Sequence, residues 1–347
     1  MPINTVTGPI QPDELGITLS HEHILIDLTC WFAEPKTASR RAMAEEPVSL
    51  SNMRFLLRDM QNVTRDNLRL QDVDMMVEEV TDYRYAGGGT IVEVSSVSLA
   101  RDPQGLKRIS QRSGVNIVMG AGYYCAASHP PSLASRSIED IQAEMVNDIT
   151  IGVDGTGIKA GVMGELGSSQ TMTAVEETVL RAAGRASRTT GVPMIVHVDS
   201  RSSGAARIVE ILEEEQARHD RIVLSHMDIQ EDLELKVELA QKGVYINYDT
   251  FGGEWYVESW IGGQQFPTDT QRIQGLKQLI DRGCLERLML SQDVCSKIQL
   301  HRYGRWGYDH ILVNVVPMMR RNGITDEQIH TMLVDNPRRM LTPTLDA

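Results

Sequence analysis

The sequence predicts an α/β fold, namely a (β/α)8 TIM barrel with a short N-terminal β-hairpin, in a single domain that spans residues 1–347. Three observations lead to this prediction. Eight short, continuous apolar runs recur along the chain, as is typical of strands that are buried on both faces of a parallel sheet. A stretch with apolar residues at three- and four-residue steps follows each run, as expected for helices that cover a barrel. No linker-like or low-complexity segment divides the chain.

The first elements follow from their turn and capping residues. Residues 3–10 alternate weakly in polarity and turn at Gly8-Pro9, which predicts the hairpin. The first barrel strand is expected at residues 17–24. Residues 25–70 are too long for an ordinary loop, so we expect a functional excursion or a partly helical segment there. A helix is expected over Val73–Tyr85, because a run of three glycines follows it and ends the pattern.

The rest of the chain alternates strand and helix with little variation. Further strands are predicted at residues 90–94, 116–120, 160–166, 193–197, 221–226, 244–248 and 287–293. Further helices are predicted at residues 104–113, 138–149, 174–189, 204–219, 233–242, 268–282, 309–321 and 325–333. A doubly wound open sheet is the structural competitor, but the chain has no G-x-G-x-x-G before its first helix and no Walker lysine motif. The barrel is therefore the better prediction.

Composition limits the class of protein and its partners. A hydrophobic fraction of 41% and a charged fraction of 23% are those of a soluble globular protein. No apolar run approaches the about 20 residues that a membrane span needs, and no secretory signal is visible, so we expect a cytoplasmic protein. The net charge of −13 repels a phosphate backbone, so we expect no nucleic-acid partner. The four cysteines are irregularly spaced and are expected to be reduced thiols.

Two histidines end the first predicted strand, in the segment LSHEH at residues 19–23. Side chains at positions i and i+2 of a strand leave the same face, so His21 and His23 should project side by side, as two ligands of one metal ion must. The intervening Glu22 should point the other way. Taken alone, the pair has a plain alternative, because two histidines on an apolar strand are often packed or surface residues.

Further metal-ligand residue types fall at the same position of other strands. In (β/α)8 barrels the catalytic groups lie at the C-terminal ends of the strands. Each of these residues has a structural alternative by itself, such as a core imidazole or a helix N-cap, but six at one end of separate strands favour a metal site. The six candidates are His21, His23, Glu165, His197, His226 and Asp293.

Six ligands exceed the three or four that one catalytic zinc ion takes, which indicates two divalent ions about 3.5–4 Å apart. We assign His21, His23 and Asp293 to one ion, His197 and His226 to the other, and Glu165 to the bridge between them. Imidazole and carboxylate ligands suit Zn²⁺ best, with Mn²⁺, Co²⁺ or Fe²⁺ as alternatives.

The order of these residues resembles the amidohydrolase superfamily. Several strings narrow the resemblance to the phosphotriesterase-related family over nearly the whole chain. They are GP at residues 8–9, LSHEH at 19–23, GELGS at 164–168, YGxxGYDH at 303–310 and DNP at 335–337. The resemblance implies a TIM barrel and hydrolysis at a two-metal centre.

The chain departs from the best-known members of that family at two positions. Phosphotriesterases and homoserine-lactonases bridge their ions with a carboxylated lysine on strand four, whereas this chain has Glu165 there, like the glutamate-bridged phosphotriesterase homology branch. The nearby Lys159 precedes the strand and is expected to be structural. The lactonase branch has an arginine after the strand-seven aspartate, whereas Thr250 follows Asp249 here, which argues against a homoserine-lactonase.

The expected function is metal-dependent hydrolysis, in which a hydroxide between the two ions attacks a carboxylic ester or lactone. Asp293 is the catalytic candidate, because it can bind metal and also pass a proton to the leaving group. Phosphotriester or amide cleavage by the same mechanism is an alternative. Two further alternatives are a barrel that binds metal or ligand without turnover and, less well supported, a mononuclear deaminase.

Substrate contacts are expected from the segments that follow the strand ends, where all four tryptophans lie. The aromatic residues have the alternative role of packing the loops onto the barrel. Arg302 is a candidate partner for a substrate carboxylate, although exposed arginines in a long loop usually do not have that role. The candidates are Tyr124, Trp255, Trp260, Arg302 and Trp306. The expected partner is a small-molecule substrate, with a homodimer left open.

Overall fold

The computed structural model describes residues 1–199, 204–257 and 264–345. Its centre is an eight-stranded parallel sheet in which the strands follow one another in chain order. Ser20 Oγ donates to the Leu290 carbonyl at 3.1 Å, and His21 N donates to Ser291 Oγ at 3.0 Å, so the two ends of the sheet meet and close a barrel. The strands are β3 (Ile17–Glu22), β6 (Gly88–Glu93), β7 (Asn116–Ala121), β8 (Val162–Leu166), β9 (Met194–His197), β10 (Ile222–Ser225), β11 (Tyr245–Tyr248) and β14 (Leu288–Leu290).

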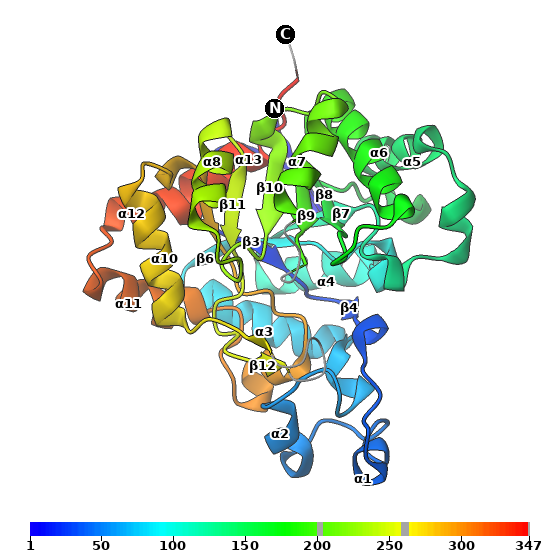
Figure 1. The fold of residues 1–347 in the computed structure, drawn as a ribbon, viewed down its shortest axis with the longest axis vertical. Helices are drawn as coiled ribbons and strands as arrows, with labels where there is room; N and C mark the ends of the chain where they lie inside the picture. Colours follow the sequence, from blue (N-terminus) through cyan, green and yellow to red (C-terminus); the bar gives the residue numbers. More distant parts are fainter. Residues whose placement is uncertain (200–203, 258–263, 346–347) are drawn as a thin grey trace.

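Helices alternate with these strands and lie outside the barrel (Figure 1). They include α3 (Val73–Tyr85), α4 (Pro103–Ser113), α5 (Ile138–Thr150), α6 (Ala174–Thr190), α7 (Ala205–Glu214), α8 (Leu233–Lys242), α10 (Asp269–Asp281), α11 (Val316–Arg321), α12 (Asp326–His330) and α13 (Asn336–Leu341). The predicted (β/α)8 barrel is confirmed.

Local signals explain most helix bounds, and two predicted bounds were wrong. The helix predicted at residues 325–333 continues from α12 through a π-helical turn at Thr331–Asp335 into α13, which ends at Leu341. Thr173 and Glu176 form a capping box at the start of α6, and Gly191 ends that helix in a left-handed conformation. The helix predicted at residues 204–219 ends at Glu214 instead. Gln216 has a φ of 60°, a left-handed conformation that cannot continue a right-handed helix.

The end of the barrel that carries both termini is closed by apolar packing. The predicted hairpin is present as β1 (Ile3–Thr5) and β2 (Gly8–Ile10). Ile3 and the α13 residues Met340 and Leu341 pack on the side chains that fill the barrel interior. These interior residues are Val92, Val118, Val162, Ile195, Val223, Tyr245 and Met289. This end is therefore a packed core, and the opposite end is left for a site.

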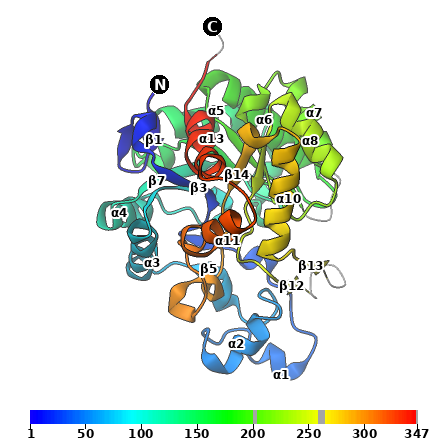
Figure 2. The same cartoon turned by 90° about the vertical axis from the view of Figure 1, so that its left-hand side faces the viewer.

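The long connection after β3 forms a lobe at that opposite end. It begins and ends in a two-stranded ribbon, in which β4 (Ile26–Asp27) pairs with β5 (Arg69–Leu70). Between them lie α1 (Ala38–Arg41) and α2 (Leu50–Leu56). Figures 1 and 2 both show α1 and α2 at the end of the molecule away from the two termini. The segment is thus partly helical, as expected, and it covers the C-terminal ends of the strands.

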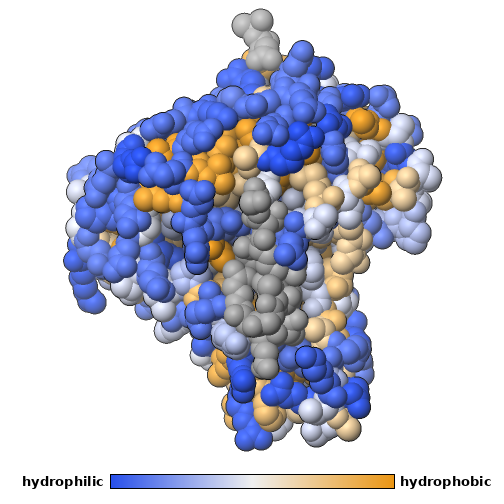
Figure 3. Space-filling view, viewed as in Figure 1, coloured by the Kyte–Doolittle hydropathy of each residue, from blue (hydrophilic) through white to orange (hydrophobic). Residues whose placement is uncertain are grey.

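The surface agrees with the composition. Hydrophilic residues dominate the face shown in Figure 3, and apolar residues form separate patches on it. Among the helices of the described residues, none is both long and apolar enough to span a membrane. All four cysteines lie in the described part of the chain, and none of them forms a disulfide.

Candidate metal centre

The strand ends bring the six predicted metal-site residues together. His21 lies in β3, Glu165 lies in β8, and His197 is the last residue of β9. His226 and Asp293 follow β10 and β14 in left-handed conformations, with φ values of 60° and 51°. The strands predicted at residues 17–24, 221–226 and 287–293 were too long at their C-terminal ends. The second and third cannot extend to His226 and Asp293, because left-handed backbone cannot continue a β-ladder.

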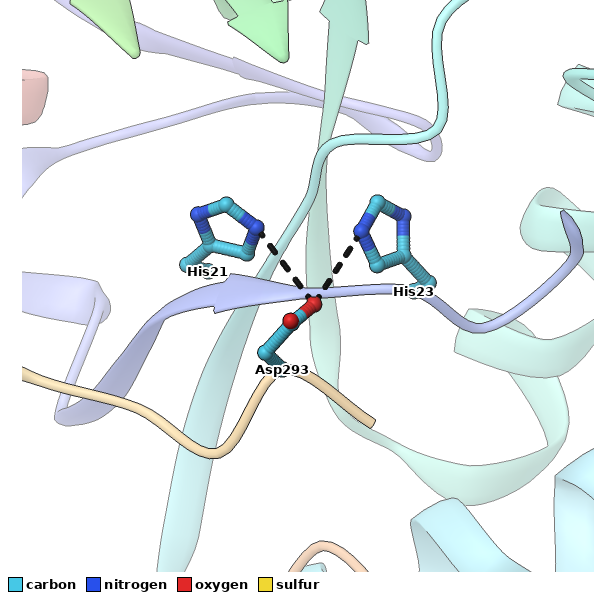
Figure 4. Close-up of side chains that lie close together, drawn as sticks. All are labelled: His21, His23 and Asp293. Carbon is cyan, nitrogen blue, oxygen red and sulfur yellow. Dashed lines mark ion pairs between the residues drawn. The ribbon is translucent and has the colours of Figure 1, made fainter. Parts of the chain in front are cut away.

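Two histidines and an aspartate form the first half of the cluster. Asp293 Oδ1 lies 3.3 Å from His23 Nε2 and 3.7 Å from His21 Nε2. Figure 4 shows the two rings on either side of the Asp293 carboxylate, directed at the same oxygen. One nitrogen or oxygen of each residue lies within 4.8 Å of the other two, which is a spacing that one metal ion can span.

Glu165 connects that half to the second pair of histidines. Its Oε1 lies 3.0 Å from His197 Nδ1 and 3.2 Å from His226 Nε2, and its Oε2 lies 3.7 Å from His23 Nε2. Gly120 of β7 permits this arrangement, because a Cβ atom there would lie 1.9 Å from the Gly164 carbonyl oxygen. The two carboxylate oxygens of Glu165 thus face both halves of the cluster.

Asp249, which the sequence reasoning did not include in the site, orients two of the histidines. Its carboxylate lies 3.2 Å from His21 Nδ1 and 3.0 Å from His226 Nδ1, and it also accepts from His226 N at 2.7 Å. Ser95 Oγ holds His23 Nδ1 at 2.9 Å in the same way. Each Nε2 is therefore directed into the cluster, as in metal sites whose histidines have a second partner. The sequence signal that could have identified Asp249 is its position directly after the seventh apolar run.

The electrostatics of the cluster are those of tightly paired acids and imidazoles. Burial alone would lower the pKa of the His21 imidazole, but Glu165, Asp249 and Asp293 outweigh burial and raise that pKa to about 9. Burial likewise opposes the net rise in the pKa of His226, which Asp249 and Glu165 cause. Although burial would raise the pKa of Glu165, His21 and His197 hold it well below the usual range. Glu165 is thus held in its ionised form, and the His21 and His226 imidazoles are held in their protonated forms when no other cation is present.

Two further observations test whether these residues fit a metal ion. His21 Nε2 is buried and has no hydrogen-bond partner within the described residues. A buried polar atom without a partner costs about 1–3 kcal/mol. His197 Nδ1 and His226 Nε2 lie 2.9 Å apart, at hydrogen-bond distance, so these two nitrogens face the same point beside Glu165. The donor set, with four imidazoles and two carboxylates, therefore fits divalent first-row ions.

A cavity that is partly open to solvent lies over the cluster. Five cluster residues contribute to its floor, and its walls are mainly apolar. The excursion at residues 25–70 supplies four wall residues, and the segments after β10 and β11 supply most of the remainder. The apolar wall residues are Leu28, Trp31, Met60, Ile229, Trp255, Val257 and Phe266. Apolar walls above a floor of a few convergent polar groups are the character of a small-molecule site.

The predicted substrate contacts divide into two groups. Tyr124 and Trp255 line the cavity, and Tyr124 Oη lies 3.4 Å from His197 Nδ1. Trp306 is 46% exposed and stacks on His310, outside the cavity wall. Arg302 also lies outside it, because its guanidinium points to Glu78 at 3.6 Å while its backbone N–H donates to Glu79. Trp260 lies outside the described residues.

A buried arginine holds the cavity wall that follows β11. Arg272 of α10 donates from Nε to Asp228 at 2.7 Å and from Nη2 to the Gly253 carbonyl at 2.9 Å. Its Nη2 also donates to Thr250 Oγ1 at 2.7 Å. The segment that carries Trp255 is thereby fixed to α10. Beyond Trp255, β12 (Tyr256–Val257) pairs with β13 (Gln264–Gln265).

Gln61 is a cavity residue that the sequence reasoning missed. Its side chain lines the cavity and is only 2% exposed, and its Oε1 has no hydrogen-bond partner among the described residues. No pattern in the sequence marked it, because it lies in an irregular part of the excursion. A buried amide oxygen without a partner at a cavity wall is a candidate contact for a bound molecule.

The eight-stranded barrel and its cluster at the strand ends define a metal-dependent hydrolase. The model of the phosphotriesterase family matches residues 1–341, and the chain belongs to that family. The N-acetyltaurine hydrolase of Salmo salar is 36% identical over 342 residues, which cover 98% of this chain and 97% of that protein.

Two solved structures extend the comparison. A resiniferatoxin-binding protein from Rhodobacter sphaeroides superposes with a TM-score of 0.95 at 38% identity, over 100% of this chain and 96% of that one. The phosphotriesterase homology protein from Escherichia coli, complexed with phosphate in its active site, gives 0.78 at 29% identity, over 95% and 100%. These similarities agree with the predicted family.

Proposed function

We propose that this chain hydrolyses a carboxylic ester or lactone at a centre of two divalent metal ions. The observation that carries the proposal is the convergence of six ligand-type side chains, one of which, His21, has a buried Nε2 without a hydrogen-bond partner in the described residues. A structural cluster would be expected to satisfy that nitrogen within the chain.

The distances support a division of the ligands between two ions. His21, His23 and Asp293 would hold the first ion, and His197 and His226 would hold the second. Glu165 would bridge them, because its two oxygens face both groups. The exposed Lys159 precedes β8 and is too far along the strand to serve as a bridge. Zn²⁺ is the expected metal, and Mn²⁺, Co²⁺ or Fe²⁺ would also suit these donors.

Bound metal ions would supply a nucleophile at neutral pH by lowering the pKa of water from about 15.7 to about 7, and would polarise the substrate carbonyl. The chain's own residues would do the rest. Asp293 faces the cavity with 23% of its side chain exposed, so it can accept the proton of the attacking water and return it to the leaving group. Trp255 and Tyr124 would orient the substrate against the cavity wall and exclude bulk water.

Amide hydrolysis is the second candidate. Curated relatives at 36% identity are named N-acetyltaurine hydrolases. The amide oxygen of Gln61, which lacks a donor among the described residues, could accept a hydrogen bond from a substrate N–H. An ester or lactone has no such donor at the bond that breaks.

The test is a panel of matched substrates on metal-replete protein. Phenyl acetate, acetanilide, γ- and δ-lactones, N-acetyltaurine and a paraoxon-like triester should be assayed with two Zn²⁺ or two Mn²⁺ ions per chain. We expect the carbonyl substrates to be cleaved faster than the triester. Preference for acetanilide and N-acetyltaurine over phenyl acetate would select the amide candidate. Protein that holds both ions and cleaves none of them would favour a barrel that binds metal without turnover.

A further inference from the structure

Glu22 lies between two of the candidate ligands but points away from them. In β3 its side chain leaves the strand on the face opposite to His21 and His23, and it is fully buried. A buried carboxylate needs donors on its oxygens, and Glu22 finds three of them in one short segment after β14. Its Oε1 accepts from Ser291 Oγ at 2.7 Å and from Gln292 N at 2.8 Å. Its Oε2 accepts from Val294 N at 2.8 Å.

These three hydrogen bonds enclose Asp293 without touching its side chain. The Gln292 and Val294 amides lie on either side of it in the chain, so their attachment to one carboxylate fixes the backbone at both of its ends. Asp293 has a φ of 51°, which is unfavourable for a residue with a Cβ atom and needs support from its surroundings. Glu22 provides that support.

The same strand also contacts this segment through its backbone. His21 N donates to Ser291 Oγ at 3.0 Å, and His23 N donates to the Val294 carbonyl at 3.2 Å. Ser291 Oγ therefore accepts from His21 and donates to Glu22. All three residues of the His21–His23–Asp293 group are thus placed by one strand and the segment bonded to it.

We propose that Glu22 is a positioning residue, whose carboxylate sets the Asp293 side chain against His21 and His23. The role rests on the proposed function of Asp293 as ligand and proton acceptor. The proposal goes beyond that function because it assigns a role to Glu22, the residue between the two histidines. Glu22 itself has no access to the substrate.

The main variant is Glu22→Gln, which keeps the volume but replaces one acceptor oxygen by an NH₂ group that faces a backbone or hydroxyl donor. We expect about 10–100-fold weaker binding of one Zn²⁺ ion, the usual effect of losing the partner that orients a metal ligand. The second ion should bind as in the parent. On an aryl ester that the parent cleaves, kcat should fall with little change in KM, because the cavity wall is untouched.

Glu176→Gln is the matched control. Glu176 is also fully buried and also accepts from two backbone amides and one serine hydroxyl, namely Ala126 N at 2.9 Å, Thr173 N at 2.7 Å and Ser169 Oγ at 2.6 Å. It has no hydrogen bond to the segment around Asp293 in the described residues. Its replacement should destabilise the fold comparably and leave Zn²⁺ affinity unchanged.

A double-mutant cycle separates positioning from general stability. In an Asp293→Asn background, Glu22→Gln should reduce kcat and Zn²⁺ affinity by less than about threefold, because the group that it positions has already been altered. Fully additive effects would overturn the proposal, as would equal Zn²⁺ affinities in Glu22→Gln and Glu176→Gln.

If Glu22→Gln does not fold, Ser291→Ala tests the same segment more mildly. It removes one donor to Glu22 and the acceptor of His21 N, and it leaves the bonds from Gln292 N and Val294 N to Glu22. It should weaken the binding of the same Zn²⁺ ion by a smaller factor, and an unchanged Zn²⁺ affinity would contradict the proposal. The affinity measurement also distinguishes the two hypotheses. A parent that binds two ions but is inactive on every substrate contradicts the hydrolase, whereas normal Zn²⁺ binding by Glu22→Gln contradicts the positioning role.

Discussion

The metal cluster and the walls of the cavity above it are built in different ways. Cluster residues lie on barrel strands or directly beyond them, and Asp249 and Ser95 hold three of the imidazoles by their second nitrogen. The walls come from the excursion at residues 25–70 and from the segment after β11, where Trp255 packs as an apolar surface and Gln61 has an oxygen without a partner in the described residues. The strands thus determine the chemistry, and the loops determine which molecule reaches it.

This difference implies a separation of effects. Changes in the cluster should alter metal binding and kcat for every substrate. Changes in the walls should alter the preference among substrates and leave the metal content as it was.

Metal removal should give the largest effect. Dialysis against a chelator such as 1,10-phenanthroline should abolish hydrolysis of all substrates, and Zn²⁺ or Mn²⁺ should restore it as two ions bind per chain. Metal analysis by plasma spectrometry, paired with the assay, checks both points. A reconstituted stoichiometry of one or less would contradict the two-ion centre.

Asp293→Asn should lower kcat by about 10²–10⁴-fold, which is the usual share of general acid–base catalysis. Most of the metal should remain, because the amide oxygen still coordinates weakly. The loss should be greatest for esters with poor leaving groups, since p-nitrophenolate departs without a proton. If the variant and the parent cleave esters with good and poor leaving groups at equal rates, Asp293 serves only as a metal ligand.

Glu165→Gln should weaken binding of both ions by about 10–100-fold, because the amide replaces one of the two oxygens that face the two halves of the cluster. Lys159→Ala is the control, and it should change neither metal content nor rate. Reconstitution should need no bicarbonate. A bicarbonate requirement would instead indicate a carboxylated lysine as the bridge.

Metal affinity should rise with pH up to about 9. Glu165, Asp249 and Asp293 raise the pKa of His21 to about 9 against the effect of burial. At pH 7 the metal-free imidazole is therefore protonated and must lose its proton before it binds a cation. For each proton that the metal displaces, the metal affinity should rise about tenfold per pH unit until the pH reaches that pKa. Calorimetric Zn²⁺ titrations in two buffers of different ionisation enthalpy count the protons, and zero release at pH 7 would contradict this expectation.

Gln61→Leu should have the smallest effect on the rate of hydrolysis and the clearest effect on the preference between amide and ester substrates. It removes a buried amide oxygen that has no hydrogen-bond partner in the described chain, so the free energy of unfolding should rise by about 1 kcal/mol. If Gln61 binds a substrate N–H, kcat/KM should fall about tenfold for acetanilide and stay unchanged for phenyl acetate. Urea unfolding and the paired assay check both parts. A loss of stability would show that the amide has a structural role.

The sequence by itself determined the barrel and the side chains that meet at one of its ends. Strand periodicity is local, so the alternation at His21, Glu22 and His23 could be read from neighbouring residues. The position of the other candidates at the ends of apolar runs predicted that they converge, because parallel strands place their C-terminal ends on one face of a barrel. Their role as ligands stays a prediction.

Only the tertiary structure decided how those side chains are held and what surrounds them. The left-handed conformations of His226 and Asp293 and the bonds from Asp249 to His21 depend on strands that are distant in the chain. The cavity wall includes Gln61 and Trp255 and omits Arg302 and Trp306, although all lie outside the barrel strands and the α-helices. The direction of a loop side chain is set by long-range contacts, such as the bond from Arg272 to the Gly253 carbonyl, and no local periodicity predicts it.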